Sequence, residues 1–279
     1  LGGCHHGQEG DFAANGVIPV INSLPQLDRW REWALEGKTR LPAALHIDTA
    51  MTRLGLDADE VAHLKDQLQI DGHWLDAVDL CCVMSHLAAG EDTADPTNDR
   101  QLADFTELAT AFAGVPLSLA NSGGVLRGGG FHMALTRPGI ALYGLHPAGH
   151  EAAHEQIDQA AKLQPAVTWQ ARILQRRTAR AGDRVGYNGT HRLERDSRIV
   201  TLGVGYADGY PRALGNRASV EIAGETAPVV GRVSMDSITV DVTDIAESRI
   251  AAVDHATILG SRYDLASMAR DAGTIGYEI

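Results

Sequence analysis

Polar residues that could do acid–base or binding chemistry recur directly after short apolar runs in the first half of the chain. Imidazole and guanidinium groups donate protons, carboxylates accept them, and Ser and Asn side chains bind oxyanions. The residues at these positions are His46, Asp48, Ser85, His86, Asn121, Ser122 and Arg137. If the apolar runs are parallel strands, these side chains meet at the edge where barrel enzymes have their active sites. The pattern predicts an enzyme.

The elements that must position these residues alternate in type up to about Gly144. Period-two or continuous apolar runs predict strands at 17–21, 43–48, 80–84, 116–120 and Ile140–Tyr143. Period-3.6 patterns predict three helices. The first is Leu24–Glu36, which Ser23 could cap. The other two are marked by apolar stripes, one of Val61, Leu64 and Leu68 and one of Leu102, Phe105, Leu108 and Phe112. Strands that alternate with helices predict parallel βαβ units, and several units in series favour a (β/α)8-type barrel.

From about Pro165 the helical period gives way to short alternating strands. Ile238, Val240 and Val242 are separated by polar residues, as in a strand buried on one face. One late helix is expected at Leu265–Ala272. The chain is therefore divided into a barrel domain at 1–147, a connector at 148–164 and a mainly β C-terminal domain at 165–279.

Composition excludes several classes of function. The formal net charge of -12 argues against nucleic acid or an anionic membrane as a partner. No apolar run approaches the roughly 20 residues of a membrane span, and no secretory signal is visible. Cys4, Cys81 and Cys82 form no disulfide framework, so a cytoplasmic location is expected. Because no second ligand pair follows Cys4-His5-His6, we interpret it as a polar loop, and no metal site is predicted.

Two motifs in the second half, GYADGYPR and GRVSMD, resemble the C-terminal domain of alanine racemase. Four motifs of the first half resemble the same family: HIDTAMTRLGL, MSHLA, ANSGG and RPGIALYG. The resemblance covers nearly the whole chain. It implies a homodimeric pyridoxal 5′-phosphate enzyme that interconverts L-alanine and D-alanine through an aldimine and supplies D-alanine for peptidoglycan.

The resemblance assigns Arg53 to the cofactor's phenolic oxygen and the substrate carboxylate, two tasks that suit a planar, permanently charged guanidinium. Two residues beside it depart from the family. His46 stands where many racemases carry a lysine that can be carbamylated and holds this arginine, and Ala50 stands in place of the usual glycine. His46 could still orient Arg53, but a carbamate could not form there.

The other barrel motifs match cofactor contacts. His86 matches the imidazole that connects the catalytic tyrosine to the arginine beneath the pyridine ring, and Arg137 matches that arginine. An arginine keeps the pyridine nitrogen unprotonated, because it is always a proton donor. Further cofactor contacts are implied for Asn121, Ser122, Gly139 and Ile140, the last three on the phosphate.

In the C-terminal domain, the resemblance gives Tyr206 the role of the base that acts on L-alanine, in the active site of the other subunit. Met235 matches a residue whose backbone N–H contacts the substrate carboxylate, and Asp236 matches a neighbouring orienting carboxylate. Tyr277 matches a phosphate-binding tyrosine, although Gly276 replaces the common asparagine.

The family's cofactor lysine, in a Lys-x-Asp-x-Tyr-Gly segment, has no counterpart here. The lysines of this chain are Lys38, Lys65 and Lys162, and none follows a predicted strand. That lysine is also the base on the D-alanine face. We therefore expect a truncated racemase that lacks the first barrel strands and the extreme C-terminus, and that is inactive as this polypeptide alone.

Three alternatives remain open at this point. One is another pyridoxal-phosphate enzyme, a decarboxylase or an amino-acid racemase of broader specificity. A second is a metal-dependent hydrolase built on His46, Asp48 and His86, which leaves RPGIALYG unexplained. The third is a non-catalytic remnant that binds the cofactor without a covalent link.

Overall fold

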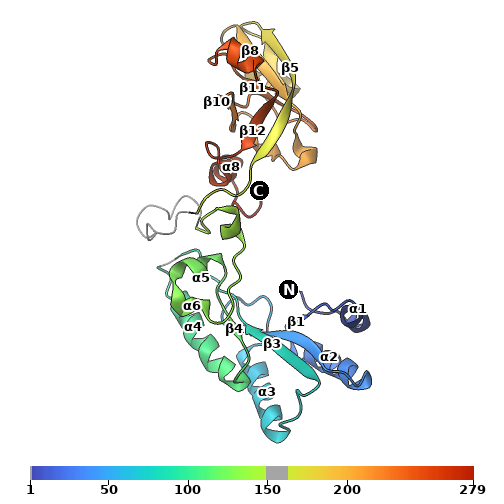
Figure 1. The fold of residues 1–279 in the computed structure, drawn as a ribbon. Coiled ribbons are helices and arrows are strands. Elements are labelled where there is room, and N and C mark those ends of the chain that lie inside the picture. Colours follow the sequence, from blue (N-terminus) through green and yellow to red (C-terminus); the bar gives the residue numbers. More distant parts are fainter. Residues whose placement is uncertain (1, 93, 149–162) are drawn as a thin grey trace. The chain divides into compact units, whose positions relative to one another are not determined.

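The computed structural model describes residues 2–92, 94–148 and 163–279. They fall into two compact units, Leu1–Gly139 and Ile140–Ile279 (Figure 1). Most of the expected connector at 148–164 lies outside the described residues. None of the helices in these ranges is long and apolar enough to cross a membrane.

The first unit contains a parallel sheet of four strands that lie side by side in sequence order (Figure 1). The strands are β1 Val20–Ile21, β2 Leu41–His46, β3 Val78–Met84 and β4 Leu117–Ser118. The helices are α1 Glu9–Ala14, α2 Leu24–Glu36, α3 Ala58–Ile70, α4 Thr97–Leu108, α5 Ser122–Arg127 and α6 Gly129–His132, with a 3-10 turn η1 Ala109–Phe112 after α4. Each crossover between these parallel strands carries a helix, as the alternation of patterns predicts.

The two faces of this sheet are different. Ile21, Leu45 and Val83 pack with helix residues, among them Leu27, Trp30, Val61, Leu64 and Phe105, in the main core. A small cluster lies on the other side and consists of Val20, Ala44, Cys82 and Met84. Because strand side chains alternate, His46 shares the face of Ala44 rather than that of Leu45. The sheet therefore buries one face under helices and presents His46 on the other.

The second unit is mainly β. Its six-stranded sheet has the order β10-β9-β12-β5-β8-β11. The strands are β5 Trp169–Ala179, β8 Ser197–Leu202, β9 Ser219–Ile222, β10 Glu225–Pro228, β11 Ile238–Asp241 and β12 His255–Leu259, and β6 Arg184–Val185 pairs with β7 His191–Arg192. The edge strands β10 and β11 meet through a bridge between Val229 and Val240, so the sheet curls round its core. The sequence-based expectation of a barrel-like α/β unit followed by a β unit is confirmed.

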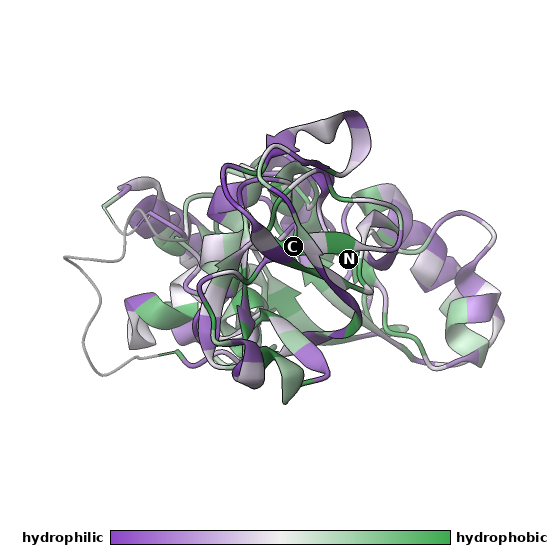
Figure 2. Ribbon diagram, turned by 90° about the horizontal axis from the view of Figure 1, so that it is seen from above, coloured by the Kyte–Doolittle hydropathy of each residue, from purple (hydrophilic) through white to green (hydrophobic). Residues whose placement is uncertain are grey.

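Short helices and turns complete the second unit. They are η2 Ile140–Tyr143, η3 Tyr187–Gly189, η4 Tyr206–Asp208, η5 Arg212–Leu214, α7 Glu247–Ala251 and α8 Leu265–Ala272. Helix α8 has the predicted bounds because Asp264 caps its first turn and Gly273 ends it with a left-handed backbone. Figure 2 shows hydrophobic residues along the strands and hydrophilic ones on turns and outer helix faces.

Three local predictions need correction. The segment Ile140–Tyr143 is a 3-10 turn and not a strand, with Leu142 and Tyr143 exposed to 66% and 57%. A run of four apolar residues does not distinguish a strand from a turn. The strand expected at 17–21 is confined to β1, because Val17 turns back to bond the carbonyl of Phe12. Ser23 lies at the N-cap of α2, but its side chain makes no capping hydrogen bond.

Candidate active site

The carboxyl ends of β2, β3 and β4 bring the predicted polar residues of the first unit to one edge of the sheet. Strand β2 ends at His46, and β3 is followed by Ser85 and His86. Strand β4 is followed by Asn121 and Ser122. The strands are parallel and in register, so their ends share this edge.

Arg137 is anchored by the ends of β3 and β4. One terminal nitrogen of its guanidinium donates to the hydroxyl of Ser118, and the other donates to the carbonyl of Ser85 over 2.6 Å. Ser118 is itself fixed, since its hydroxyl donates to the carbonyl of Leu135 over 2.8 Å. No salt bridge within the described ranges neutralises Arg137. A half-buried cation is therefore held in place with its charge available to a ligand.

The two imidazoles at this edge are neutral at pH 7. Burial lowers the pKa of His46 to about 4, and the positive charge of Arg137 acts in the same direction. Burial likewise lowers the pKa of His86, with further contributions from Arg137 and Arg53. Burial also lowers the pKa of Arg137, but a guanidinium keeps its proton at any physiological pH. The site is cationic through its arginines alone, which suits an anionic ligand.

Arg53 lies in a strained loop between β2 and α3. One carboxylate oxygen of Asp48 accepts the backbone N–H groups of Ala50 (3.1 Å) and Met51 (2.8 Å), so Asp48 organises the loop. Ala50 has a φ of 149° and Thr52 a φ of 51°, values that residues with a side chain rarely adopt. The strain at Ala50 gives a physical reason why glycine is the residue expected here from the family resemblance.

The Asn-Ser-Gly-Gly segment builds a tight turn into α5. Asn121 caps the helix, because its Oδ1 accepts from the N–H of Gly124 over 3.1 Å. The hydroxyl oxygen of Ser122 accepts from the N–H of Gly139 over 2.9 Å. A side chain at Gly123 would meet the backbone of Gly90 at 2.0 Å, whereas the space beside Gly139 is open. Ser122 and Gly139 are thus joined at a point that a ligand can approach.

Four residues that sequence reasoning passed over hold this edge together. They are Asn22, Thr49, Gln101 and Ser118, and all are buried. The side-chain amide of Gln101 donates to the hydroxyl of Thr49 and to the carbonyl of His86, both over 3.0 Å. The sequence could have revealed Gln101, because it is a polar residue at helical spacing from Phe105, on the apolar stripe of α4.

In the second unit, Tyr206 lies on the turn η4 beside the Ser234-Met235 segment. The N–H of Tyr206 donates to the carbonyl of Ser234 over 3.1 Å, and that of Ala207 donates to the carbonyl of Met235 over 2.9 Å. A side chain at Gly205 would collide with the carbonyl of Met235 at 2.2 Å. Tyr206 is exposed to 44%, so its phenol is presented rather than packed.

A second tyrosine, Tyr187, lies on a turn against Gly231-Arg232, just before the Ser234-Met235 segment in the chain. It follows Gly186, where a side chain would lie 3.1 Å from the backbone nitrogen of Arg232. It precedes Asn188, which has a φ of 60°. Tyr187 is exposed to 69% and stands on a strained turn, a combination common at functional sites. The Asn188-Gly189 pair predicts a turn here, but nothing in the sequence singles out Tyr187 as functional.

Of the remaining predicted residues of this unit, Met235, Asp236 and Tyr277 are exposed, whereas Ile140 is buried. Met235 and Asp236 lie on the turn before β11, and within the described ranges no hydrogen bond uses the backbone N–H of Met235. Tyr277 follows Gly276, where a side chain would lie 2.0 Å from a methyl group of Leu145. Glycine therefore lets the backbone pass close to Leu145 at this point.

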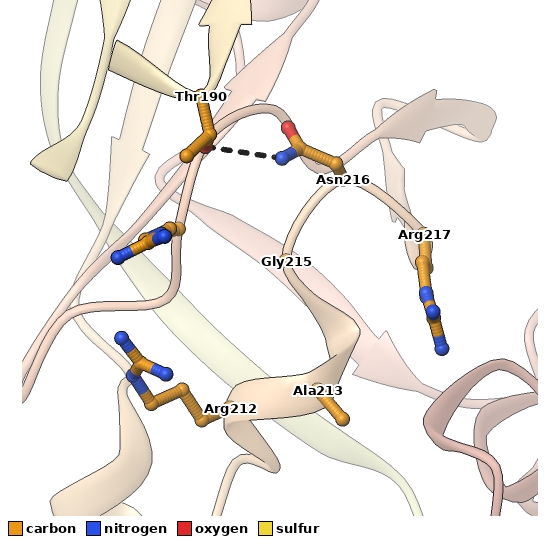
Figure 3. Close-up of a pocket in the computed structure, with 7 residues that line it drawn as sticks. Thr190, Arg212, Ala213, Gly215, Asn216 and Arg217 are labelled. Carbon is orange, nitrogen blue, oxygen red and sulfur yellow. Dashed lines mark hydrogen bonds between the residues drawn. The ribbon is translucent and has the colours of Figure 1, made fainter. Parts of the chain in front are cut away.

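One hollow of the second unit lies apart from the predicted residues. It has a volume of about 310 Å³ and is lined by Thr190, Arg212, Ala213, Gly215, Asn216, Arg217 and Arg232. The amide of Asn216 donates to Thr190 over 3.2 Å, whereas Arg212 and Arg217 extend in different directions from the η5 turn (Figure 3). Within the described ranges, no three potential metal ligands come together anywhere.

Comparison with known proteins shows matches along nearly the whole chain. Residues 1–147 match the family model "Alanine racemase, N-terminal domain" and residues 166–279 match "Alanine racemase, C-terminal domain". The alanine racemase of Acidiphilium cryptum is 44% identical over 279 residues, which are 100% of this chain and 74% of the relative. The catabolic alanine racemase of Rhizobium johnstonii is 41% identical over 282 residues, or 100% of this chain and 71% of the relative.

Solved structures give the same result. The alanine racemase from Bartonella henselae with covalently bound pyridoxal phosphate superposes with a TM-score of 0.85 at 35% identity. The biosynthetic alanine racemase from Pseudomonas aeruginosa superposes with a TM-score of 0.81 at 33% identity. Each comparison covers 100% of this chain and 74% of the other one.

Proposed function

Because this chain belongs to the alanine racemase family, we propose that it serves the interconversion of L-alanine and D-alanine with pyridoxal 5′-phosphate as cofactor. The reaction removes the Cα proton from one face and returns a proton to the other. The observation that carries the proposal is Arg137, a half-buried guanidinium fixed by two strand ends without a carboxylate partner in the described ranges.

The residues at the strand ends fit the cofactor. When bound, pyridoxal 5′-phosphate withdraws electrons from the alanine Cα and so makes its proton removable. Arg137 would donate to the pyridine nitrogen and, being always protonated, would leave that nitrogen without a proton of its own. The phosphate would be held by Ser122 and by the backbone N–H groups of Gly139 and Ile140, with the N–H of Gly139 exchanging its bond to the Ser122 hydroxyl for one to the phosphate. The open space beside Gly139 supports this assignment.

Asn121, His86 and Tyr277 would complete the cofactor contacts. Asn121 orients the turn that carries Ser122, since it caps α5. His86 is neutral, so it can accept a proton from a phenol or hold it in a hydrogen bond. Tyr277 is proposed as a further phosphate contact from the second unit.

The substrate carboxylate would be bound by the guanidinium of Arg53 and the backbone N–H of Met235, with Asp236 as an orienting neighbour. Arg53 suits this task because its fork of donors matches the two oxygens of a carboxylate. Because no described residue accepts a hydrogen bond from the N–H of Met235, this group is available for its part in the proposal.

No described lysine supplies a covalent anchor at the strand ends. Lys38 lies between α2 and β2, at the amino ends of the strands, and Lys65 lies on α3. Lys162 lies outside the described residues. The chain's own residues therefore hold the cofactor by non-covalent contacts in this proposal.

A phenol of the second unit would act as the base toward L-alanine. Tyr206 is the candidate from the sequence, and its presented side chain supports it. Tyr187 is a second candidate, favoured by its greater exposure and by the strained backbone at Asn188. The turn of Tyr206 contacts the Ser234-Met235 segment, and the turn of Tyr187 lies against Gly231-Arg232 just before it, so either phenol could act next to a bound carboxylate.

We also propose that the two domains divide the work in a homodimer. Residues 1–147 would bind the cofactor, and residues 165–279 would carry the phenol into the site of a second subunit in a homodimer. The D-alanine would enter peptidoglycan in the cytoplasm, where the three unpaired cysteines stay reduced. An amino-acid racemase of broader specificity is the alternative, and the test must include other amino acids.

The test begins with the coding region upstream of Leu1, where a Lys-x-Asp-x-Tyr-Gly segment in frame would supply the second base. The encoded protein is then given pyridoxal 5′-phosphate and L-alanine, and D-alanine is measured. Formation of D-alanine supports the proposal, and its absence overturns it. Turnover of L-serine at a comparable rate would support the broader specificity instead.

Single variants identify the phenol. Loss of the acid–base group costs about 10²–10⁴-fold in turnover. We expect a loss of this size in either Tyr206→Phe or Tyr187→Phe but not in both, with Tyr143→Phe as the exposed control. Near-normal turnover in both variants would overturn the assignment of the base to a phenol of this unit.

A further inference from the structure

The turn that carries Tyr187 does not fix its own position. It closes the hairpin of β6 and β7, in which each strand has only two residues. A hairpin this short is marginal without contacts to the rest of the fold. Because Tyr187 is exposed to 69%, packing does not hold its phenol either. The place of the phenol therefore depends on what holds the two ends of the turn.

The first end of the turn lies against the chain at Gly231 and Arg232. A side chain at Gly186 would lie 3.1 Å from the backbone nitrogen of Arg232. Gly186 and Gly231 have φ values of 73° and 83°, a left-handed backbone that glycine adopts without strain. The residue before them in this segment is fixed to β11, because the N–H of Val230 donates to the carbonyl of Thr239 over 2.9 Å. The turn thus begins on a well-anchored segment.

The last end of the turn is held to the same segment by Asn216. The Nδ2 of Asn216 donates to the hydroxyl of Thr190 over 3.2 Å (Figure 3). The N–H of Gly231 donates to the Oδ1 of Asn216 over 2.6 Å. A backbone N–H can only donate, so the amide oxygen faces Gly231 and the amide nitrogen faces Thr190. One side chain therefore joins the end of the Tyr187 turn to the segment on which that turn begins.

Asparagine suits this position for a second reason. Asn216 has a φ of 60°, a left-handed backbone in which asparagine is much more common than most residues with a side chain. It follows Gly215, where a side chain would lie 2.9 Å from the carbonyl oxygen of Gly231. Glycine could adopt the backbone of Asn216 but has no amide to offer. Asparagine meets both requirements at once.

The segment that Asn216 binds runs on to Met235, whose N–H is proposed to bind the substrate carboxylate. Asn216 thus sets the turn of Tyr187 in relation to the group that holds the substrate. Tyr206 has no need of such a bond, because its own backbone N–H donates to the carbonyl of Ser234.

We propose that Asn216 is a positioning residue for Tyr187 and acts through its hydrogen bond to Thr190. The inference rests on the proposed function, and it assigns the base toward L-alanine to Tyr187 rather than Tyr206. A proton is transferred only when the phenol oxygen is within hydrogen-bond reach of it. A misplacement of about 1 Å can cost up to about 10²-fold in rate, so a bond remote from the reacting atoms affects turnover.

Hydrogen exchange of the 279-residue chain, followed by NMR, tests whether this bond holds the turn. The probe is the N–H of Gly189, which donates to the carbonyl of Gly186 inside the turn over 3.0 Å. Thr190→Val keeps the shape of the side chain without its hydroxyl and should speed this exchange about fivefold, the factor for one hydrogen bond. Thr190→Ser keeps the hydroxyl and should exchange like the parent.

Thr226→Val, at an exposed position on β10, is the matched control and should leave the exchange of Gly189 unchanged. Equal exchange at Gly189 in Thr190→Val and in the parent would overturn the inference.

Kinetics of the encoded protein with pyridoxal 5′-phosphate test whether the bond acts through the phenol. Thr190→Val should lower kcat for L-alanine about tenfold and leave KM unchanged, because the phenol moves the proton and other groups bind the carboxylate. Combined with Tyr187→Phe it should cause no further loss, whereas combined with Tyr206→Phe the two losses should multiply. A further tenfold loss in the Tyr187→Phe background would show that Thr190 only supports the fold, and would overturn the inference.

Two replacements that tolerate a left-handed backbone test Asn216 itself. Asn216→Gly removes both hydrogen bonds and should lower kcat at least as much as Thr190→Val. Asn216→Asp still accepts from Gly231 and can accept from the Thr190 hydroxyl, so it should retain most of kcat. Equal losses in the two variants would exclude the side chain of Asn216 as the positioning group. Failure of the proposed function would appear differently, as a parent that forms no D-alanine while Gly189 still responds to Thr190→Val.

Discussion

The side-chain amide of Gln101 donates to the hydroxyl of Thr49 over 3.0 Å and ties helix α4 to the loop that follows β2. The same amide accepts from the N–H of Ala88 over 2.8 Å and donates to the carbonyl of His86. One buried residue thus holds the segment after β3 and the loop of Arg53 at a fixed separation. All its polar atoms have partners, which is the condition under which a buried amide stabilises a fold.

Gln101→Leu should destabilise the first unit strongly. Leucine fills a similar volume but leaves the N–H of Ala88, the carbonyl of His86 and the hydroxyl of Thr49 without this partner. We expect a loss of about 3 kcal/mol in the free energy of unfolding. Urea unfolding followed by tryptophan fluorescence measures it. Gln69→Leu on the exposed side of α3 should change it by less than about 0.5 kcal/mol. Equal effects would show that the network contributes no stability.

Ala50→Gly should stabilise the chain, against the usual direction for glycine. At a φ of 149° alanine is strained, and such strain costs on the order of 1–3 kcal/mol. Glycine removes this cost and adds a smaller entropy cost, so a gain of about 1 kcal/mol is expected. The matched control is Ala62→Gly, an exposed position inside α3, where a loss of about 1 kcal/mol is expected. A loss at both positions would show that Ala50 is not strained.

Stability should fall as the pH is lowered from about 6.5 to 4 because of His46. The pKa of its imidazole is lowered from 6.5 to about 4 in the folded chain, so the unfolded chain binds the proton first. The stabilisation is fully present above pH 6.5 and is lost as the pH falls toward 4. A shift of this size corresponds to about 3 kcal/mol.

The variant His46→Gln isolates this contribution. Its unfolding free energy should vary less steeply between pH 6.5 and 4 than that of the parent chain. His63→Gln, on the exposed side of α3, should retain the parental slope. Parallel curves for His46→Gln and the parent would mean that His46 titrates at an ordinary pH. Because the pKa of His86 is also lowered, His86 makes the unfolding free energy fall further as the pH is lowered, and this contribution remains in both variants.

Pyridoxal 5′-phosphate should bind the 279-residue chain reversibly and depend on Arg137. Reduction with borohydride should leave no stoichiometric adduct, because no described lysine stands at the strand ends. Arg137→Met should raise the dissociation constant about tenfold, equivalent to about 1.4 kcal/mol. Arg100→Met, on the exposed side of α4, should leave it unchanged. A stoichiometric lysine adduct that Arg137→Met abolishes would contradict this prediction.

The sequence by itself determined most of the helices and strands and the sheet edge at which we propose that the chemistry lies. The bounds of α2 and α8 follow from local periodicity and end residues, which act within one or two turns of a helix. His46, His86 and Ser122 could be assigned to one edge because parallel strands all end on the same side. The family motifs are likewise local runs of residues, so they could be read without a structure.

Only the tertiary structure decided which side chains hold the site in place. Asn22 and His46 are 24 residues apart, and Thr49 and Gln101 are 52 apart, so nothing in the local sequence pairs them. The protonated nitrogen of His46 depends on which atom of Asn22 faces the ring. Burial, which sets the charge of the imidazole, exists only after packing. The exposure of Tyr187 on its strained turn is likewise a property of the packed second unit and not of its sequence period.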